Sequence, residues 1–206
     1  MTGRLHILKL RLRAFGQDGS VYSRTIEFGN GLTIILGTNS SGKSLCIMSI
    51  LYALGAEGML SAKRAVPLPH ALTDFLKDGT SDVHLQSSDV TLELANHVGE
   101  EMTVKRVIRR GPEAPEDTHL VHTWKGRVLS ESMDLAEAAT DYYVRMPGSA
   151  KHESGFHTLL ATFLGWSLPT VTKFDGTETL LYIECIFPLF FIEQKKGWSG
   201  LQARMP

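Results

Sequence analysis

Cysteine is scarce in this chain of 206 residues, which contains only Cys46 and Cys185. Each of the two lies within an apolar run, and neither belongs to a Cys-x-x-Cys pair. The sequence therefore supports neither a disulfide framework nor a zinc knuckle, and a reducing cytoplasmic location is expected.

Long hydrophobic runs and an excess of one charge are also missing. The longest apolar stretch, residues 180–192, is interrupted by Glu184 and Pro188, and it is shorter than the roughly 18 residues that a membrane-spanning helix needs. The N-terminus has no apolar segment of the kind found in signal peptides. With 21 basic and 22 acidic residues the formal net charge is −1, so contact with nucleic acid would require a local basic patch. We expect no membrane segment.

Apolar residues are abundant enough for one core, since they make up 43% of the chain. No internal repeat appears, so residues 1–206 are predicted to form a single unit. Within it we distinguish antiparallel strands in 1–36, a phosphate loop and helix in 37–56, a β-meander in 82–130 and a mainly helical part in 131–206.

The first 36 residues carry the strand signals. Apolar and basic residues alternate over 8–13, which predicts a strand with one buried face. A turn at 17–20 leads to a second strand, 21–28, and Gly29-Asn30-Gly31 predicts a tight hairpin. The almost wholly apolar residues 32–36 then predict a strand covered on both faces.

Hydrophobic patterns predict the remaining elements. Residues 43–56 are expected to form a buried helix that ends at Gly55. Two further hairpins are expected, 83–110 turning at 97–100 and 118–130 turning at 125–126. Three more helices are expected at 133–142, 156–165 and 178–187, followed by a short buried strand at 189–192.

One motif carries specific chemistry, the segment Gly37-Thr38-Asn39-Ser40-Ser41-Gly42-Lys43-Ser44. Its spacing is that of a Walker A phosphate loop, in which glycines let the backbone approach phosphates closely and the N–H groups at a helix N-terminus point at them. Lys43 is expected to neutralise the β- and γ-phosphates, and Ser44 to bind Mg²⁺. The apolar run before the motif and the helix after it supply the required context, so we predict binding of ATP with Mg²⁺.

The sequence around this motif, LKLRLRAF…TIEFGNGLTIILGTNSSGKSLCIMSILYALG, resembles the start of the ABC-type ATPase head of SMC-like proteins and double-strand-break repair ATPases. The resemblance implies an α/β P-loop NTPase fold, specifically the N-terminal lobe of such a head with an antiparallel β-subdomain. It also implies that Phe190-Phe191-Ile192-Glu193-Gln194 is the Q-loop, with Gln194 facing Mg²⁺ and the γ-phosphate. Lys63 and Arg64 resemble the family's arginine loop, although a solvated basic pair explains them at least as well.

The motifs of a complete head that follow the Q-loop are not recognisable here: the signature motif, the Walker B acid, the D-loop and the switch histidine. The resemblance therefore implies a C-terminal head lobe and a second head as partners, with hydrolysis weak or absent in the lobe alone. It further implies DNA binding, repair or defence through the assembled complex, and a possible nuclease or accessory subunit.

Two other interpretations remain open. Residues 179–184 have the form of a Walker B strand, and with Glu184 as its acid the chain would be a self-sufficient compact NTPase or kinase. A nucleotide-sensing module that never hydrolyses is the third possibility. Lys105, Arg106, Arg109 and Arg110 form a basic stripe on an expected strand, which we interpret as a solvated face rather than a phosphate contact.

Overall fold

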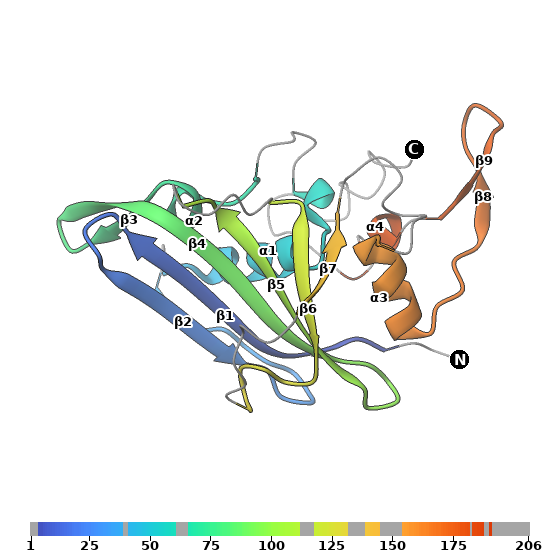
Figure 1. The fold of residues 1–206 in the computed structure, drawn as a ribbon, viewed down its shortest axis with the longest axis horizontal. Helices are drawn as coiled ribbons and strands as arrows, with labels where there is room; N and C mark the ends of the chain where they lie inside the picture. The colour runs from blue at the N-terminus through green and yellow to red at the C-terminus, as the bar shows by residue number, and fades with distance from the viewer. Residues whose placement is uncertain are drawn as a thin grey trace.

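The computed structural model describes residues 4–38, 41–60, 66–111, 118–131, 139–144, 154–181, 183–187 and 190. A seven-stranded antiparallel sheet dominates it, in the order β2-β1-β4-β5-β6-β7 with β3 paired to β4 (Figure 1). Its strands are β1 (His6–Gly16), β2 (Val21–Glu27), β3 (Phe75–Asp78), β4 (Ser81–Ala95), β5 (Glu101–Arg109), β6 (Leu120–Lys125) and β7 (Thr140–Tyr143). A separate hairpin of β8 (Thr170–Thr172) and β9 (Glu178–Leu180) projects from the body.

The alternation expected in the first strand is present in β1. Leu10, Leu12 and Ala14 are buried, whereas the basic residues between them point to the other face, because successive side chains of a strand alternate. The turn between β1 and β2 is closed by a hydrogen bond from Gly16 N to Ser20 O of 2.8 Å. The predicted strands 8–13 and 21–28 and the hairpin 83–110 are thus confirmed.

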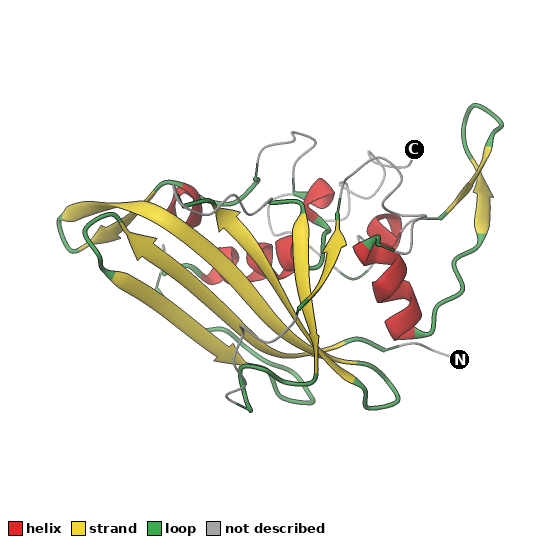
Figure 2. Ribbon diagram, viewed as in Figure 1, coloured by secondary structure: helices red, strands yellow, loops and turns green. Residues whose placement is uncertain are grey.

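The helices are short, and the longest packs on one face of the sheet. They are α1 (Lys43–Ala53), the 3-10 turn η1 (Glu57–Met59), α2 (His70–Thr73), α3 (Phe156–Leu164) and α4 (Ile183–Ile186). Helix α1 contacts β1, β4 and β5, and the opposite face of these strands is turned toward the viewer in Figure 2 without a helix over it. No helix within the described ranges is both long and apolar enough to cross a lipid bilayer.

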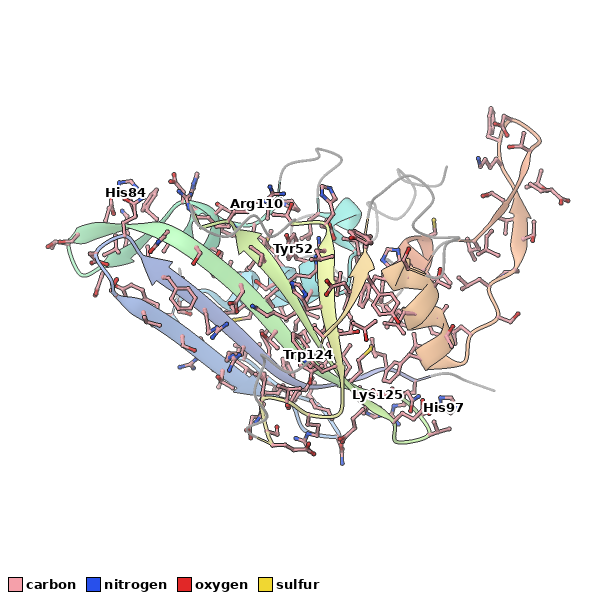
Figure 3. All side chains as sticks on the ribbon, viewed as in Figure 1. Tyr52, His84, His97, Arg110, Trp124 and Lys125 are labelled. Atoms are coloured by element: carbon pink, nitrogen blue, oxygen red, sulfur yellow. The ribbon has the colours of Figure 1, made fainter. Side chains whose placement is uncertain are left out.

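The core lies between the sheet and α1. Leu92 of β4 and Val104 of β5 have no exposed surface, and Ile50 and Tyr52 of α1 are buried against them. Figure 3 labels Tyr52 among the side chains behind the strands. At the other end of the molecule, α3 adds Phe156 to the same core.

The strand expected directly before the phosphate loop is not formed. Residues 32–36 have no strand assignment, and Leu32, Ile34 and Leu36 are 89%, 66% and 86% exposed. A strand requires a neighbour that accepts and donates main-chain hydrogen bonds, and within the described residues none lies beside this segment. The prediction of a doubly covered strand was wrong for the chain by itself.

Three expectations for the later part of the chain also need correction. The hairpin expected within 118–130 is not formed. The residues after Gly126 form a turn, and β6 pairs with β5 and β7. The end of the helix expected at 133–142 is strand β7, while residues 132–138 lie outside the described ones. The expected helix 178–187 divides into β9 and α4, whereas α3 confirms the helix at 156–165.

Candidate nucleotide-binding site

The phosphate loop connects the exposed segment 32–36 to the N-terminus of α1. Gly37, Thr38, Ser41 and Gly42 are described, and Lys43 and Ser44 form the start of the helix. Asn39 and Ser40 lie outside the described residues. The loop curls back on itself, because Ser41 N donates a hydrogen bond of 3.3 Å to Thr38 O.

Two glycines suit this geometry. A Cβ atom at Gly37 would lie 2.4 Å from Ser41 Oγ and 3.3 Å from Ser41 Cβ, so a side chain there would require Ser41 to move. Gly42 has a φ angle of 86°, a left-handed conformation that L residues rarely adopt. The motif glycines therefore allow the backbone to fold tightly at the entrance to α1.

The N-terminus of α1 is available to an anion. Gly42 makes no side-chain cap, no acidic residue stands in the first turn, and the helical hydrogen bonds begin with Cys46 N to Gly42 O at 3.1 Å. The N–H groups of the first turn lie at the positive end of the helix dipole. This arrangement is the physical basis of phosphate binding at a helix N-terminus.

Lys43 lies over the loop in this structure. Its Nζ donates hydrogen bonds of 2.7 Å to Gly37 O and 2.6 Å to Thr38 O, which keeps the ammonium group within the curve of the loop. Ser44, the next residue, is exposed in the first helical turn. Both side chains are thus on the solvent-facing side of the site.

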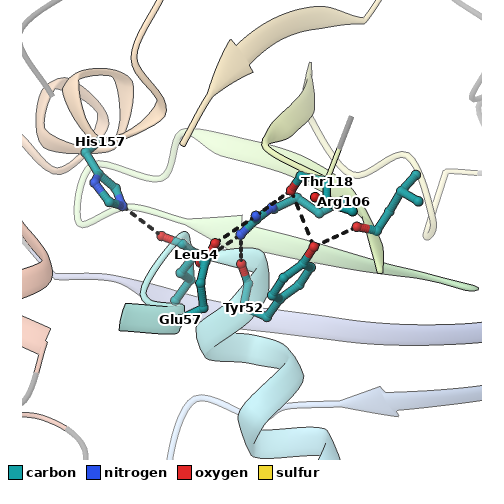
Figure 4. A network of polar contacts seen from close by, with 7 residues as sticks. Tyr52, Leu54, Glu57, Arg106, Thr118 and His157 are labelled. Atoms are coloured by element: carbon teal, nitrogen blue, oxygen red, sulfur yellow. Dashed lines mark hydrogen bonds and ion pairs between the residues drawn. The ribbon is translucent and has the colours of Figure 1, made fainter. Parts of the chain in front are cut away.

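The other end of α1 is held by a buried ion pair (Figure 4). Arg106 of β5 and Glu57 of η1 are 1% and 3% exposed, and both guanidinium Nη atoms lie 2.9 Å from a Glu57 carboxylate oxygen. Arg106 also donates to Tyr52 O at the end of α1, and to Thr118 O at 2.7 Å. Because a cation near the C-terminus of a helix is stabilised by the helix dipole, Arg106 fixes the end of α1 against the sheet.

Tyr52 and His157 extend the same network. The guanidinium carbon of Arg106 lies over the Tyr52 ring, 4.0 Å from the ring centroid. The Tyr52 hydroxyl donates a hydrogen bond of 2.7 Å to Val107 O. His157 Nε2 of α3 lies 3.3 Å from Leu54 O (Figure 4). Burial lowers the pKa of His157, so the ring is neutral near pH 7 and its N–H can donate to that carbonyl. The helix that begins at the phosphate loop is therefore tied to β5 and α3.

Several predicted site residues are not brought to the loop by the described structure. Gln194, Lys63 and Arg64 lie outside the described residues, so the Q-loop and the arginine loop stay predictions. The backbone of Glu184 is in α4, and among the described strands β9 pairs only with β8, in the projecting hairpin. The described residues of 179–184 therefore do not form a Walker B strand of the main sheet.

The predicted basic stripe on β5 is not one surface. Arg106 points into the core, and Lys105 points to the opposite face because side chains alternate along the strand. Arg109 Nη1 lies 3.9 Å from Asp74 Oδ1 next to α2. The interpretation as a single solvated face was wrong for Arg106.

Arg106, Glu57 and Tyr52 were not predicted to form a structural unit. One signal was present: Arg106 stands between Val104 and Ile108 at the core-facing positions of an alternating strand. A cation at such a position requires a buried acid or carbonyl groups as partners. The sequence does not reveal that Glu57 provides that acid, because η1 and β5 are distant in the chain.

Comparison with known proteins identifies relatives of this chain. Residues 9–136, which include most of β1, the phosphate loop, α1 and strands β2 to β6, match the family model described as an AAA domain. Structural maintenance of chromosomes protein 6 of Saccharomyces cerevisiae is 25% identical over 122 residues, covering 57% of this chain and 10% of that relative. The chain thus corresponds to about a tenth of the length of that relative.

The family match covers more than half of the chain and includes the whole phosphate loop. The loop geometry and the sheet-dominated α/β fold agree with a P-loop NTPase that binds nucleotide. The chain therefore belongs to the AAA domain family, as the N-terminal region of an SMC-like ATPase head.

Proposed function

We propose that the chain is the ATP-binding half of an ABC-type, SMC-like ATPase head. It binds ATP with Mg²⁺ through the phosphate loop and Gln194, and a C-terminal lobe completes it for hydrolysis. Two completed heads then dimerise around the bound nucleotides, which couples ATP to DNA binding, repair or defence. Support for the DNA role comes from the resemblance and from the name of the yeast relative.

The observation that carries this proposal is the exposed apolar segment 32–36. Leu32, Ile34 and Leu36 are large, apolar and mostly exposed, and they lead directly into the phosphate loop. An apolar segment whose main-chain groups are not paired with any described strand is a template for strand addition. We infer that a strand of the C-terminal lobe pairs with this segment and covers it.

The phosphate contacts follow from the loop geometry. On binding, the N-terminus of α1 faces the β-phosphate, and Lys43 Nζ turns from the carbonyl groups of Gly37 and Thr38 toward the β- and γ-phosphates. Because those carbonyls are exposed, water can replace the hydrogen bonds that Lys43 gives up at small cost. Lys43 is therefore free to exchange its partners.

The residues present fit a magnesium ion that is carried in with the nucleotide. Within the described ranges no group of three or more His, Cys, Asp or Glu side chains could hold a metal by itself. Mg²⁺ often binds through one or two protein oxygens together with phosphate oxygens and water. The exposed Ser44 hydroxyl supplies one such oxygen, and Gln194 is proposed to supply another. Bound Mg²⁺ would neutralise charge that develops on the phosphates.

Phosphate release measured on the chain alone and with its C-terminal lobe restored tests the proposal. We expect ATP binding but very slow turnover from the chain alone, because positioning and electrostatic stabilisation supply most of the catalysis in phosphoryl transfer. Adding the lobe should raise turnover strongly, and Gln194→Ala should abolish that gain while ATP binding persists.

Turnover on the order of 1 s⁻¹ from the chain alone would contradict the half-head proposal, because complete phosphoryl-transfer enzymes work at that rate. It would favour a self-sufficient enzyme, although the described residues of 179–184 divide between β9 and α4 and do not form the strand that such an enzyme needs. Tight ATP binding with no turnover even beside the C-terminal lobe would favour a nucleotide sensor instead.

A further inference from the structure

One cation, Arg24 of β2, lies on the same side of the sheet as α1 but beside the helix rather than under it. Its cross-strand neighbour is Leu12 of β1, which is buried in the core that α1 covers. Paired positions of neighbouring strands share a face, so Arg24 points to the α1 side as well. The main contacts of α1 are with β1, β4 and β5, and Arg24 on the edge strand is accordingly exposed.

The path of α1 brings its first turn toward β2. Its C-terminal end is held on β5, where Tyr52 meets Arg106 and Val107. The helix also contacts β4 and β1, which are the next strands in the order that ends at β2. Figure 4 shows it running from the polar network past β1 toward β2. The N-terminus of α1, which carries the phosphate loop, is therefore at the β2 side of the sheet.

Electrostatics places the Arg24 guanidinium near that first turn. Burial raises the pKa of the Cys46 thiol, and the nearby charge of Arg24 acts in the opposite direction. Cys46 N donates to Gly42 O, so Cys46 stands one helical turn, about 5.4 Å, beyond the phosphate loop. Residues three apart share a helix face, which puts Cys46 on the same side of α1 as Lys43. Arg24 and Lys43 are thus two cations next to one side of the first turn.

Arg24 has no partner in the part of the chain that the structure describes. Other polar residues of β2 are engaged: the Tyr22 hydroxyl donates to Asp78 Oδ2 at 2.9 Å, and Glu27 Oε1 lies 3.0 Å from Lys9 Nζ. No ion pair or hydrogen bond engages the Arg24 side chain among the described residues. An exposed guanidinium of this kind can take up an anion without giving up a contact of the fold.

The nucleotide expected on the phosphate loop supplies such an anion. In a Walker A site the lysine, here Lys43, reaches the β- and γ-phosphates, so the motif assigns no cation to the α-phosphate. A guanidinium presents five N–H donors in a planar fork that matches phosphate oxygens. A second cation beside the first turn of α1 is therefore suited to the phosphate that Lys43 does not serve.

We propose that Arg24 binds the α-phosphate of the nucleotide from a strand outside the phosphate-loop motif. This inference rests on the proposed function, because it requires a nucleotide on the loop. Its consequence is that Arg24 strengthens binding through the phosphate chain and is indifferent to the base.

Isothermal titration calorimetry of R24Q with Mg²⁺ and three ligands tests the proposal: ATP, ADP and inorganic tripolyphosphate. We expect all three affinities to fall by a similar factor, about tenfold, because a charged hydrogen bond to a shared phosphate position is lost. R24K should keep part of the affinity, since it retains the charge without the planar fork.

Sulfur in place of an α-phosphate oxygen locates the contact further. The parent chain should bind ATP more tightly than its α-phosphorothioate, because sulfur is the weaker hydrogen-bond acceptor. R24Q should discriminate less against at least one of the two diastereomers. Unchanged discrimination against both would overturn the assignment to the α-phosphate.

Two controls make the result specific. R4Q removes an exposed arginine ahead of β1 and should leave every affinity unchanged. Urea unfolding of R24Q should match that of the parent, because the side chain is exposed. A loss of affinity in R24Q then reports on the ligand rather than on folding, and an equal loss in R4Q would mean diffuse charge and overturn the proposal.

K43A separates this inference from the proposed function. If the parent binds ATP, K43A does not, and R24Q binds as tightly as the parent, the inference about Arg24 is overturned while the proposed function stands. If the parent binds no ATP, both are overturned. A loss in R24Q for ATP but not for tripolyphosphate would identify a contact with the base or ribose instead, and a loss for ATP but not for ADP would identify the γ-phosphate.

Discussion

At the scale of single residues, Lys43 bears most directly on nucleotide binding. Its hydrogen bonds to Gly37 O and Thr38 O hold the ammonium group inside the loop before nucleotide arrives. Both bonds are exposed, so they contribute little to the stability of the fold. The same side chain is therefore important for binding and unimportant for folding.

Lys43→Ala should abolish nucleotide binding, because the variant cannot form a charged hydrogen bond to phosphate. We expect the affinity for ATP to fall at least tenfold, which corresponds to about 1.4 kcal/mol or more of binding free energy. Isothermal titration calorimetry with ATP and Mg²⁺ measures this change, and urea unfolding should show unchanged stability. Lys77→Ala, which removes an exposed lysine of β3, is the matched control. Equal ATP affinity in Lys43→Ala and the parent would remove the assignment of the site.

At the scale of elements, α1 is fixed at one end and open at the other. Its N-terminus carries the phosphate loop, whereas its C-terminal end is held by the ion pair of Arg106 with Glu57. Both members of the pair are almost fully buried. If one of them is removed, water cannot reach the charge of the other and take the place of the missing partner. The pair is expected to determine how firmly the helix is seated on β5.

Arg106→Met should destabilise the fold by about 3–5 kcal/mol, because it leaves the Glu57 carboxylate buried without its cation. Urea unfolding measures the change. Glu57→Met should also be destabilising, and the double variant should cost less than the sum of the two, with a coupling energy above about 1 kcal/mol. Additive effects, or a cost below about 1 kcal/mol for Arg106→Met, would show that the pair does not hold the helix.

At the scale of the whole molecule, the apolar surface is unevenly distributed. The core between the sheet and α1 is well buried, yet residues 32–36 expose large apolar side chains immediately before the phosphate loop. Covering one such side chain stabilises an assembly by about 1.5–3 kcal/mol. This segment is therefore where a second lobe would gain most from docking.

Replacing Leu32, Ile34 and Leu36 together by Thr should weaken association with the C-terminal lobe by at least about a hundredfold, equivalent to about 2.7 kcal/mol. Analytical ultracentrifugation of the mixed lobes measures the affinity. The stability of the chain alone should change little, because these side chains are mostly exposed. Phe174→Thr, at a position 100% exposed in the β8–β9 hairpin, is the control and should not alter association. Unchanged affinity in the triple variant would place the docking surface elsewhere.

The local sequence by itself determined the elements whose cause is local. Alternation predicted β1, the glycine spacing predicted the phosphate loop, and the apolar pattern that follows predicted α1. For such elements, neighbouring residues supply both the pattern and the turn or helix signals. The resemblance to SMC-like heads rested on these same residues and is borne out by the comparisons.

Tertiary structure alone decided the features that depend on residues far apart in the chain. Residues 32–36 have the composition of a buried strand, but a strand forms only where a neighbour supplies the other half of its hydrogen bonds. Residues 140–143 and 178–180 became strands because β6 and β8 lie beside them. The pairing of Arg106 with Glu57 likewise depends on the packing of η1 against β5. Which distant segments lie side by side depends on long-range packing, which the order of residues along the chain does not reveal.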